Sequence, residues 1–425
     1  MITTIIAFII IFGILVFVHE FGHFFFARKS GILVREFSIG MGPKLFAVHR
    51  NGTTYTIRIL PLGGYVRMAG LEDDKDTLKQ GMPVSLLVGK DNKVKKINTS
   101  KKTTLFQGIP LEVVKWDLEK GLWIEGYENG DEDQYRHYDV DHDAMIIEQD
   151  GTEVQIAPLD VQFQSASVPK RIITNAAGAF NNFLLAIVAF FLMALLQGGV
   201  ATSTNYVGQV ESHSVAAKAG LKADDQIIKV NNHKTNTWDK LADQISANPN
   251  KKITLTVKKD GRVKKIKVTP EQKTQNGSQV GVIGITSKQH YNRSFGAIVA
   301  YGFTETWGMI VAIFSALGHM FTHGFSLNDF GGPVAMYSYT STAAHYGLVS
   351  LVGLLAVLSV NLGVVNLLPI PALDGGKILL NIIEGVRGKP VDPDKEGIIT
   401  LIGFAFLLLL MVLVTWNDIQ RYFLH

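Results

Sequence analysis

The sequence contains no cysteine among its 425 residues. Disulfide bonds, thiolate metal ligands and thiol nucleophiles are therefore excluded, and cysteine usage says nothing about the redox compartment. Charged residues are also scarce, at 18%, whereas hydrophobic residues make up 47%. This mixture predicts several membrane-spanning helices combined with one or two polar modules.

A concentrated basic region is missing as well. The net charge of +4 is small for this length and the basic residues are scattered, so nothing indicates nucleic-acid binding. No Lys or Arg precedes Arg28, so the basic opening of a secretory signal peptide is absent, and the apolar run is too long for one. We therefore expect a first membrane-spanning helix over about Ile2–Ala27.

Two histidines and a glutamate interrupt this apolar segment in the pattern His19-Glu20-Phe21-Gly22-His23. On a helix, His19 and His23 lie one turn apart on the same face, so both rings can bind one zinc ion, with Glu20 beside them to act on a water molecule. The three fixed letters of H-E-x-x-H also occur by chance in soluble chains. Ionisable residues inside a membrane span are costly and usually mark function, which favours a catalytic metal site.

A third metal ligand is expected late in the chain, in Asn366-Leu-Leu-Pro369-Ile-Pro371-Ala-Leu-Asp374-Gly375. A catalytic zinc takes three protein ligands and keeps an open position for water. Pro369 and Pro371 end a helix just before Asp374, and the freed backbone must be buried in protein or line a water-filled cavity. Taken alone, Asp374 is explained equally well as a turn at a helix end; the intramembrane H-E-x-x-H favours the ligand.

Basic residues set the predicted orientation of the spans. Arg28 and Lys29 follow the first apolar segment, which places its C-terminal end in the cytoplasm and the N-terminus outside. Further spans are predicted over about 172–196, 348–368 and 396–416. The apolar segment 295–321 is ambiguous, and we assign it to an amphipathic helix on the outer surface. Only then does Asp374 reach the same side of the membrane as the histidines. The prediction is thus four spans, with both termini outside the cell membrane and a cytoplasmic loop over Lys377–Lys395.

The segments between the spans are expected to hold β-structure and a folded module. Residues 53–68 predict two short strands joined through Gly63 and Gly64 as a hairpin near the membrane. Residues 71–171 predict a β-rich or partly mobile cytoplasmic insertion. In the second span, Gly178, Asn181 and Asn182 favour close helix packing. Residues 200–290 are similar to PDZ domains, which accept an extended peptide along a strand edge.

Taken together, these motifs resemble the bacterial site-2 proteases, which are intramembrane zinc metalloproteases. The H-E-x-x-H and N-x-x-P-x-P-x-L-D-G motifs are specific for that family, and the Gly63–Gly64 and Gly178–Asn182 stretches support the resemblance. A single PDZ-like stretch with a long cytoplasmic insertion is similar to family members from Gram-positive bacteria. The resemblance implies Zn²⁺ as the cofactor. It also implies roles for individual residues: His19, His23 and Asp374 as ligands, Glu20 as catalytic base, and Asn366, Pro369, Pro371, Gly63 and Gly64 in positioning substrate.

The resulting fold class is an α-helical polytopic membrane protein with four transmembrane helices, a membrane-associated β-hairpin and an inserted extracytoplasmic PDZ-like α+β domain. The predicted domains are 1–70, 71–171, 172–199, 200–290, 291–345 and 346–425. By resemblance, the substrates are single-span membrane proteins such as anti-sigma factors, or signal-peptide remnants, whose tails the PDZ-like domain could contact; the lipid bilayer is the other partner. Two alternatives remain open: a membrane zinc transporter or sensor, and a non-catalytic PDZ scaffold.

Overall fold

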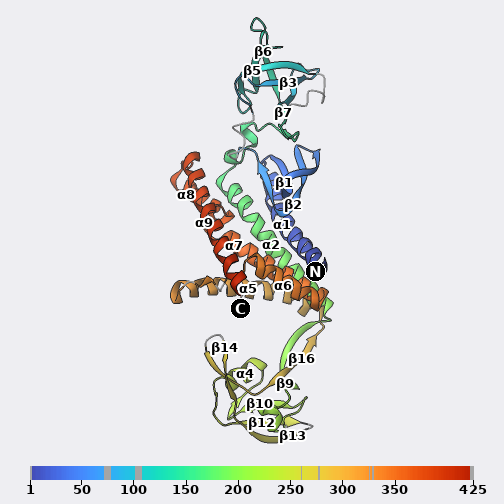
Figure 1. The fold of residues 1–425 in the computed structure, drawn as a ribbon, viewed down its shortest axis with the longest axis vertical. Helices are drawn as coiled ribbons and strands as arrows, with labels where there is room; N and C mark the ends of the chain where they lie inside the picture. Colours follow the sequence, from blue (N-terminus) through green and yellow to red (C-terminus); the bar gives the residue numbers. More distant parts are fainter. Residues whose placement is uncertain are drawn as a thin grey trace. The chain divides into compact units, whose positions relative to one another are not determined.

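The computed structural model describes residues 2–70, 78–100, 108–259, 261–275, 278–324, 326–327 and 330–421. The chain divides into two compact units, one made of Met1–Phe190 and Thr304–His425 and the other of Phe191–Phe303. Parts of the predicted insertion, residues 71–77 and 101–107, lie outside the described residues. The main helices are α1 (Ile2–Lys29), α2 (Val168–Leu196), α5 (Phe295–His323), α6 (Pro333–Tyr346), α7 (Leu348–Leu367), α8 (Asp374–Arg387) and α9 (Pro393–Ile419) (Figure 1).

Five of these helices, α1, α2, α5, α7 and α9, are long and apolar enough to cross a membrane. Four of them lie close to the predicted spans, and the fifth, α5, covers the ambiguous segment. Several of its large apolar side chains, among them Phe303 and Trp307, are exposed on the protein surface. Length and composition do not separate a crossing helix from one lying in the interface, so the count of four spans stays a prediction.

The sheet that follows α1 corrects the predicted hairpin. Residues 53–68 form one long strand, β2 (Thr53–Met68), and its two halves do not pair with each other. Both pair instead with β1 (Val34–Arg50), whose stretch from Val34 to Ile39 lies between them. Gly40 and Gly42, at φ 87° and 82°, allow β1 to turn back toward β2. The prediction missed β1 because these glycines interrupt its alternating pattern.

The stretch of β2 from Leu60 to Met68 forms one outer margin of this sheet, opposite Val34–Met41. The margin packs against α1, because a Cβ built on Gly64 would lie 3.1 Å from Cγ of Glu20 and 3.1 Å from Cγ1 of Val16. Glycine at position 64 therefore lets a strand edge run directly past the H-E-x-x-H helix.

The insertion folds as a small barrel. Its strands are β3 (Pro83–Val88), β4 (Val94–Asn98), β5 (Ile109–Asp117), β6 (Trp123–Glu128), β7 (Tyr135–Ile147) and β8 (Glu153–Gln155). They follow the order β4-β3-β5-β6-β7-β8, and an additional pairing of β4 with β7 closes the ring. Buried apolar side chains such as Leu86, Ile97, Val113 and Ile124 fill the inside. This region is thus a folded β-module with its own core.

The unit Phe191–Phe303 contains a six-stranded sheet, in the order β13-β12-β10-β9-β16, with β11 paired to β10. The core includes Val207, Leu241 and Leu255, each fully buried. Its α+β composition agrees with a PDZ-like module, but the family assignment of this unit stays a prediction. Its elements are β9 (Val200–Val210), α3 (Val215–Lys218), β10 (Gln226–Val230), β11 (His233–Lys234), α4 (Trp238–Ser246), β12 (Ile253–Lys259), β13 (Arg262–Val268), β14 (Glu271–Gln275), β15 (Ser278–Val282) and β16 (Ile285–Asn292).

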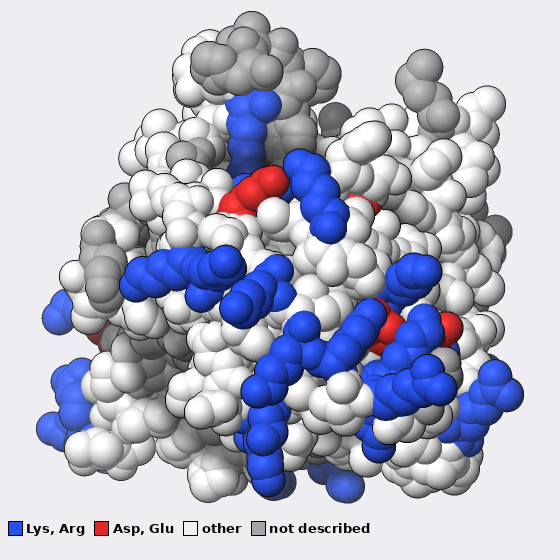
Figure 2. All heavy atoms as spheres, turned by 90° about the horizontal axis from the view of Figure 1, so that it is seen from below, with Lys and Arg blue, Asp and Glu red and all other residues white. Residues whose placement is uncertain are grey.

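Strand β13 is an outer strand of this sheet, and its basic residues Arg262, Lys264, Lys265 and Lys267 are exposed. Lysine on an outer strand discourages pairing with the strands of other molecules. Figure 2 shows one face of the molecule on which Lys and Arg side chains gather with few Asp or Glu among them. This charge pattern suits a soluble surface.

Helix α8 corrects the predicted loop over Lys377–Lys395. Most of that segment is helical, and Asp374 is the first residue of the helix. Gly388, with φ 65°, ends it in the left-handed conformation that favours glycine. The prediction missed this helix because Gly375 and Gly376 weaken the helical pattern at its start.

Candidate metal centre

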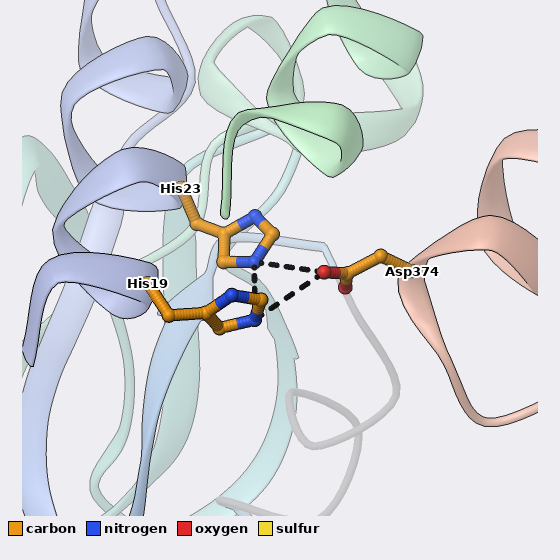
Figure 3. Close-up of side chains that lie close together, drawn as sticks. All are labelled: His19, His23 and Asp374. Carbon is orange, nitrogen blue, oxygen red and sulfur yellow. Dashed lines mark hydrogen bonds and ion pairs between the residues drawn. The ribbon is translucent and has the colours of Figure 1, made fainter. Parts of the chain in front are cut away.

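His19 and His23 project from the same face of α1, one helical turn apart, and meet Asp374 at the start of α8 (Figure 3). Nε2 of His19 lies 3.3 Å from Nε2 of His23. Oδ2 of Asp374 lies 3.4 Å from Nε2 of His19 and 3.2 Å from Nε2 of His23. The structure therefore brings together three ligand-type atoms from opposite ends of the chain.

These three distances fit a tetrahedral zinc site. Ligand atoms about 2.0–2.1 Å from a tetrahedral zinc are separated from each other by roughly 3.3 Å. The side chains are largely buried, with exposed fractions of 12% for His19, 8% for His23 and 14% for Asp374. Oδ2 of Asp374 is buried without a hydrogen-bond partner among the described residues, as expected for an oxygen reserved for a cation.

The turn after α7 delivers Asp374 to the histidines. Helix α7 ends at Leu367, and the chain reverses through Pro369, Pro371 and Ala372, which takes φ 76°. A Cβ added to Gly375 would overlap the carbonyl oxygen of Leu368. Glycine is therefore needed here so that the start of α8 can fold back against the end of α7, which places the carboxylate beside α1.

Helix α2 packs directly against the two imidazoles. A Cβ added to Gly178 would overlap Nε2 of His23 and lie 2.6 Å from Cε1 of His19. Asn181 donates a hydrogen bond from Nδ2 to the carbonyl oxygen of Val18, at 3.2 Å. The residues predicted to pack helices therefore lie at the α1–α2 contact, and Gly178 also makes room for the rings.

The remaining predicted positioning residues surround the centre at different places. Gly64 lies against Glu20, as described above. Asn366 donates to the carbonyl oxygen of Leu362 within α7, at 3.0 Å. For Gly63, Pro369 and Pro371, the described residues show no contact with the side chains of His19, His23 or Asp374. Their predicted contact with substrate stays a prediction.

Two features of the centre were not predicted from the sequence. The carbonyl oxygen of Thr174 lies 2.9 Å from Nδ1 of His23, and no residue type marks a main-chain acceptor in advance. Arg171 makes two 2.8 Å hydrogen bonds to Glu384, which tie the start of α2 to α8. Arg171 directly precedes the predicted span at 172–196, but a charge at that position indicates the orientation of a span and not the partner of an ion pair.

Comparison with known proteins adds to this geometry. The family described as "Peptidase family M50" matches residues 7–410 of the chain. The chain belongs to peptidase family M50. This M50 peptidase is therefore a multi-pass membrane protein and a site-2-type zinc metalloprotease, as the resemblance in its motifs predicted.

Named relatives resemble this M50 peptidase over their full length. It is 54% identical over 423 residues to the protein named "Probable protease eep" of Enterococcus faecalis, covering 99% of both chains. It is 48% identical over 438 residues to a protein of Lactococcus lactis whose name describes a zinc metalloprotease, covering 100% of both chains. A similarly named protein of Streptococcus pyogenes is 49% identical over 426 residues, with 99% of each chain covered. All three organisms are Gram-positive bacteria, as expected from the domain organisation.

Proposed function

We propose that this M50 peptidase hydrolyses a peptide bond within the transmembrane segment of a single-span substrate, in the cytoplasmic half of the cell membrane. His19, His23 and Asp374 hold the zinc ion, and Glu20 is the general base. The observation that carries this proposal is the convergence of three ligand-type atoms within 3.2–3.4 Å of one another.

The chemistry follows from the placement of Glu20. Bound zinc supplies a Lewis acid that lowers the pKa of a water molecule toward about 7. Glu20, next to His19 on α1, accepts the proton from this water and later passes a proton to the leaving amine. The burial of the centre excludes bulk water, so the charge of the Glu20 carboxylate is only weakly screened there.

The substrate segment must become extended before the water molecule can attack the carbonyl carbon of its peptide bond. A transmembrane helix holds its amides in internal hydrogen bonds, so it has to unwind locally before the centre can reach them. The margin of β2 at Gly63 and Gly64 would supply hydrogen-bond partners to the unwound segment by strand addition. Asn366, with Pro369 and Pro371 shaping the turn beside it, would hold the opposite edge of the unwound substrate segment.

The proposed substrates are single-span anti-sigma factors already shortened outside the membrane, or remnants of signal peptides. The PDZ-like unit would face the outside and either bind the tails of such substrates or exclude proteins with bulky outer domains. Both termini would lie outside. Regulated intramembrane proteolysis is the process in which such cleavage takes part.

Cleavage of a model single-span substrate by the purified full-length protein in detergent tests the proposal. We expect the wild type to cleave, and both Glu20→Gln and a zinc chelator to abolish cleavage, while Glu20→Gln still binds zinc. Cleavage that survives Glu20→Gln would refute the assigned base. Zinc transport without cleavage by the wild type, after reconstitution into vesicles, would support the transporter alternative instead.

A further inference from the structure

The two imidazoles of the centre are held from behind in different ways. Both present Nε2 to Asp374, so in the neutral, ligating form each ring carries its proton on Nδ1 and needs an acceptor there. His23 has such an acceptor in the carbonyl oxygen of Thr174. His19 meets a side chain, the amide of Asn182, at 3.1 Å from its Nδ1.

The side-chain amide of Asn182 is turned so that it offers a donor to His19, whereas the zinc-binding form of His19 needs an acceptor. Its Nδ2 points at Nδ1 of His19, so two N–H donors would face each other once His19 binds a metal through Nε2. In that orientation Oδ1 of Asn182 is buried and has no hydrogen-bond partner among the described residues. The nitrogen and oxygen of an amide are assigned from their surroundings, and a half-turn exchanges them. The turned amide gives His19 its acceptor.

Asn182 is itself rigidly placed. The residue is fully buried on α2, and its carbonyl oxygen accepts a 2.7 Å hydrogen bond from Oγ of Ser359, which is also fully buried. Ser359 belongs to α7, the helix that leads into the turn before Asp374. The main chain of the residue that supports one ligand is therefore hydrogen-bonded to the helix that delivers another.

We propose that Asn182 is a positioning residue that accepts the Nδ1 proton of His19 through Oδ1, and so fixes the tautomer and the ring orientation that ligate zinc. Sequence patterns suggested only helix packing for this residue. The inference rests on the zinc site proposed above, and it assigns the two ligand histidines separate supports on one helix, a carbonyl for His23 and an amide for His19.

Two substitutions of the same shape test the proposal in the full-length protein in detergent. Asn182→Asp keeps the acceptor and removes the donor, and Asn182→Leu removes both. Zinc affinity is measured by competition with a chromogenic chelator, and Co²⁺ replacement reports ligand geometry through its visible spectrum. We expect Asn182→Leu to lose about 10- to 100-fold in zinc affinity, whereas Asn182→Asp binds zinc at least as tightly as the wild type.

Asn181→Leu is the matched control, because Asn181 donates its hydrogen bond to the main chain of α1, at Val18; its zinc affinity should match the wild type. Wild-type affinity in Asn182→Leu would overturn the proposal. If that variant does not fold, judged by thermal unfolding of the metal-free protein, Asn182→Asp decides alone: a weakened site would show that the amide donates to His19. A wrong assignment of the zinc site can be told apart from a wrong role for Asn182. In that case His19→Ala would also bind zinc like the wild type.

Discussion

Gly178 on α2 faces both imidazoles, and the space around it leaves no room for a side chain. We predict that Gly178→Ala displaces the rings of His19 and His23, because its methyl group would overlap Nε2 of His23. Overpacking of this kind costs about 1–3 kcal/mol. Zinc affinity and cleavage should therefore both fall, which chelator competition and the single-span substrate assay measure.

Gly13→Ala is the control for that substitution. Gly13 lies on α1, and a Cβ built there meets no atom within 4 Å. The variant should bind zinc and cleave like the wild type. Equal zinc affinity in Gly178→Ala and Gly13→Ala would show that the close contact seen at Gly178 relaxes without cost.

The sequence pointed to the three ligand-type side chains that the structure brings together. His19 and His23 follow from a spacing that places two rings on one helix face, and Asp374 from the need for a third ligand after a broken helix. The support at Thr174 was not accessible, because any residue has a main-chain carbonyl. The contact between Asn182 and His19 was missed because it depends on the angle at which α1 and α2 pack.

At the scale of elements, the ion pair between Arg171 and Glu384 joins α2 to α8. The side chain of Arg171 is 7% exposed and that of Glu384 is 18% exposed. Removing one partner leaves a buried charge, which costs about 3–5 kcal/mol. We predict that Arg171→Leu lowers the unfolding temperature strongly, and that it weakens zinc binding because α8 carries Asp374.

The double variant Arg171→Leu with Glu384→Leu should be more stable than Arg171→Leu alone, since no unpaired charge remains. Lys288→Ala provides the comparison, because its ion pair with Asp224 is exposed to solvent and contributes little to stability. Thermal unfolding of the four proteins checks the set. A double variant that unfolds below the single one would contradict the buried-charge explanation.

Asp418, near the end of α9, caps a different helix. It is 2% exposed, and its Oδ2 accepts hydrogen bonds from the main-chain N–H groups of Gly332 and Ala335, at 2.9 and 3.0 Å. Losing such a cap typically costs about 0.5–2 kcal/mol. We predict that Asp418→Ala speeds hydrogen–deuterium exchange in the first turn of α6. Unchanged exchange there would mean that other contacts hold this helix end.

The elements that sequence reasoning misread share a physical cause. Residues 34–50 and 374–387 are interrupted by glycines at 40, 42, 375 and 376, which lower strand and helix propensity locally. In the folded protein those glycines are the points of closest approach or sharpest turning, so packing overrides the propensity. The long apolar helices also contain glycines, such as Gly13 and Gly22 in α1, but their continuous apolar runs identify them all the same, and their limits lie near the predicted ones.

The topology of the whole molecule depends on whether α5 crosses the membrane. The absence of native cysteine makes single introduced thiols unambiguous reporters. With four spans, Thr322→Cys at the end of α5 should react with a membrane-impermeant maleimide in intact cells. Lys251→Cys in the unit Phe191–Phe303 should react likewise, and Lys120→Cys in the barrel only after lysis. Protection of Thr322→Cys until lysis would show five crossings and would place Asp374 on the opposite side from the predicted one.

The closed ring of the barrel has a consequence for an enzyme that is proposed to bind a locally unwound substrate segment. Strands β3 to β7 pair all the way round, and the short β8 is covered where Arg35 donates to the carbonyl oxygen of Gln155 and Thr54 to that of Glu153. A ring of this kind offers no template to a stray segment. The barrel therefore does not compete for an unwound segment, which under the proposed function pairs with the strand that runs past Glu20.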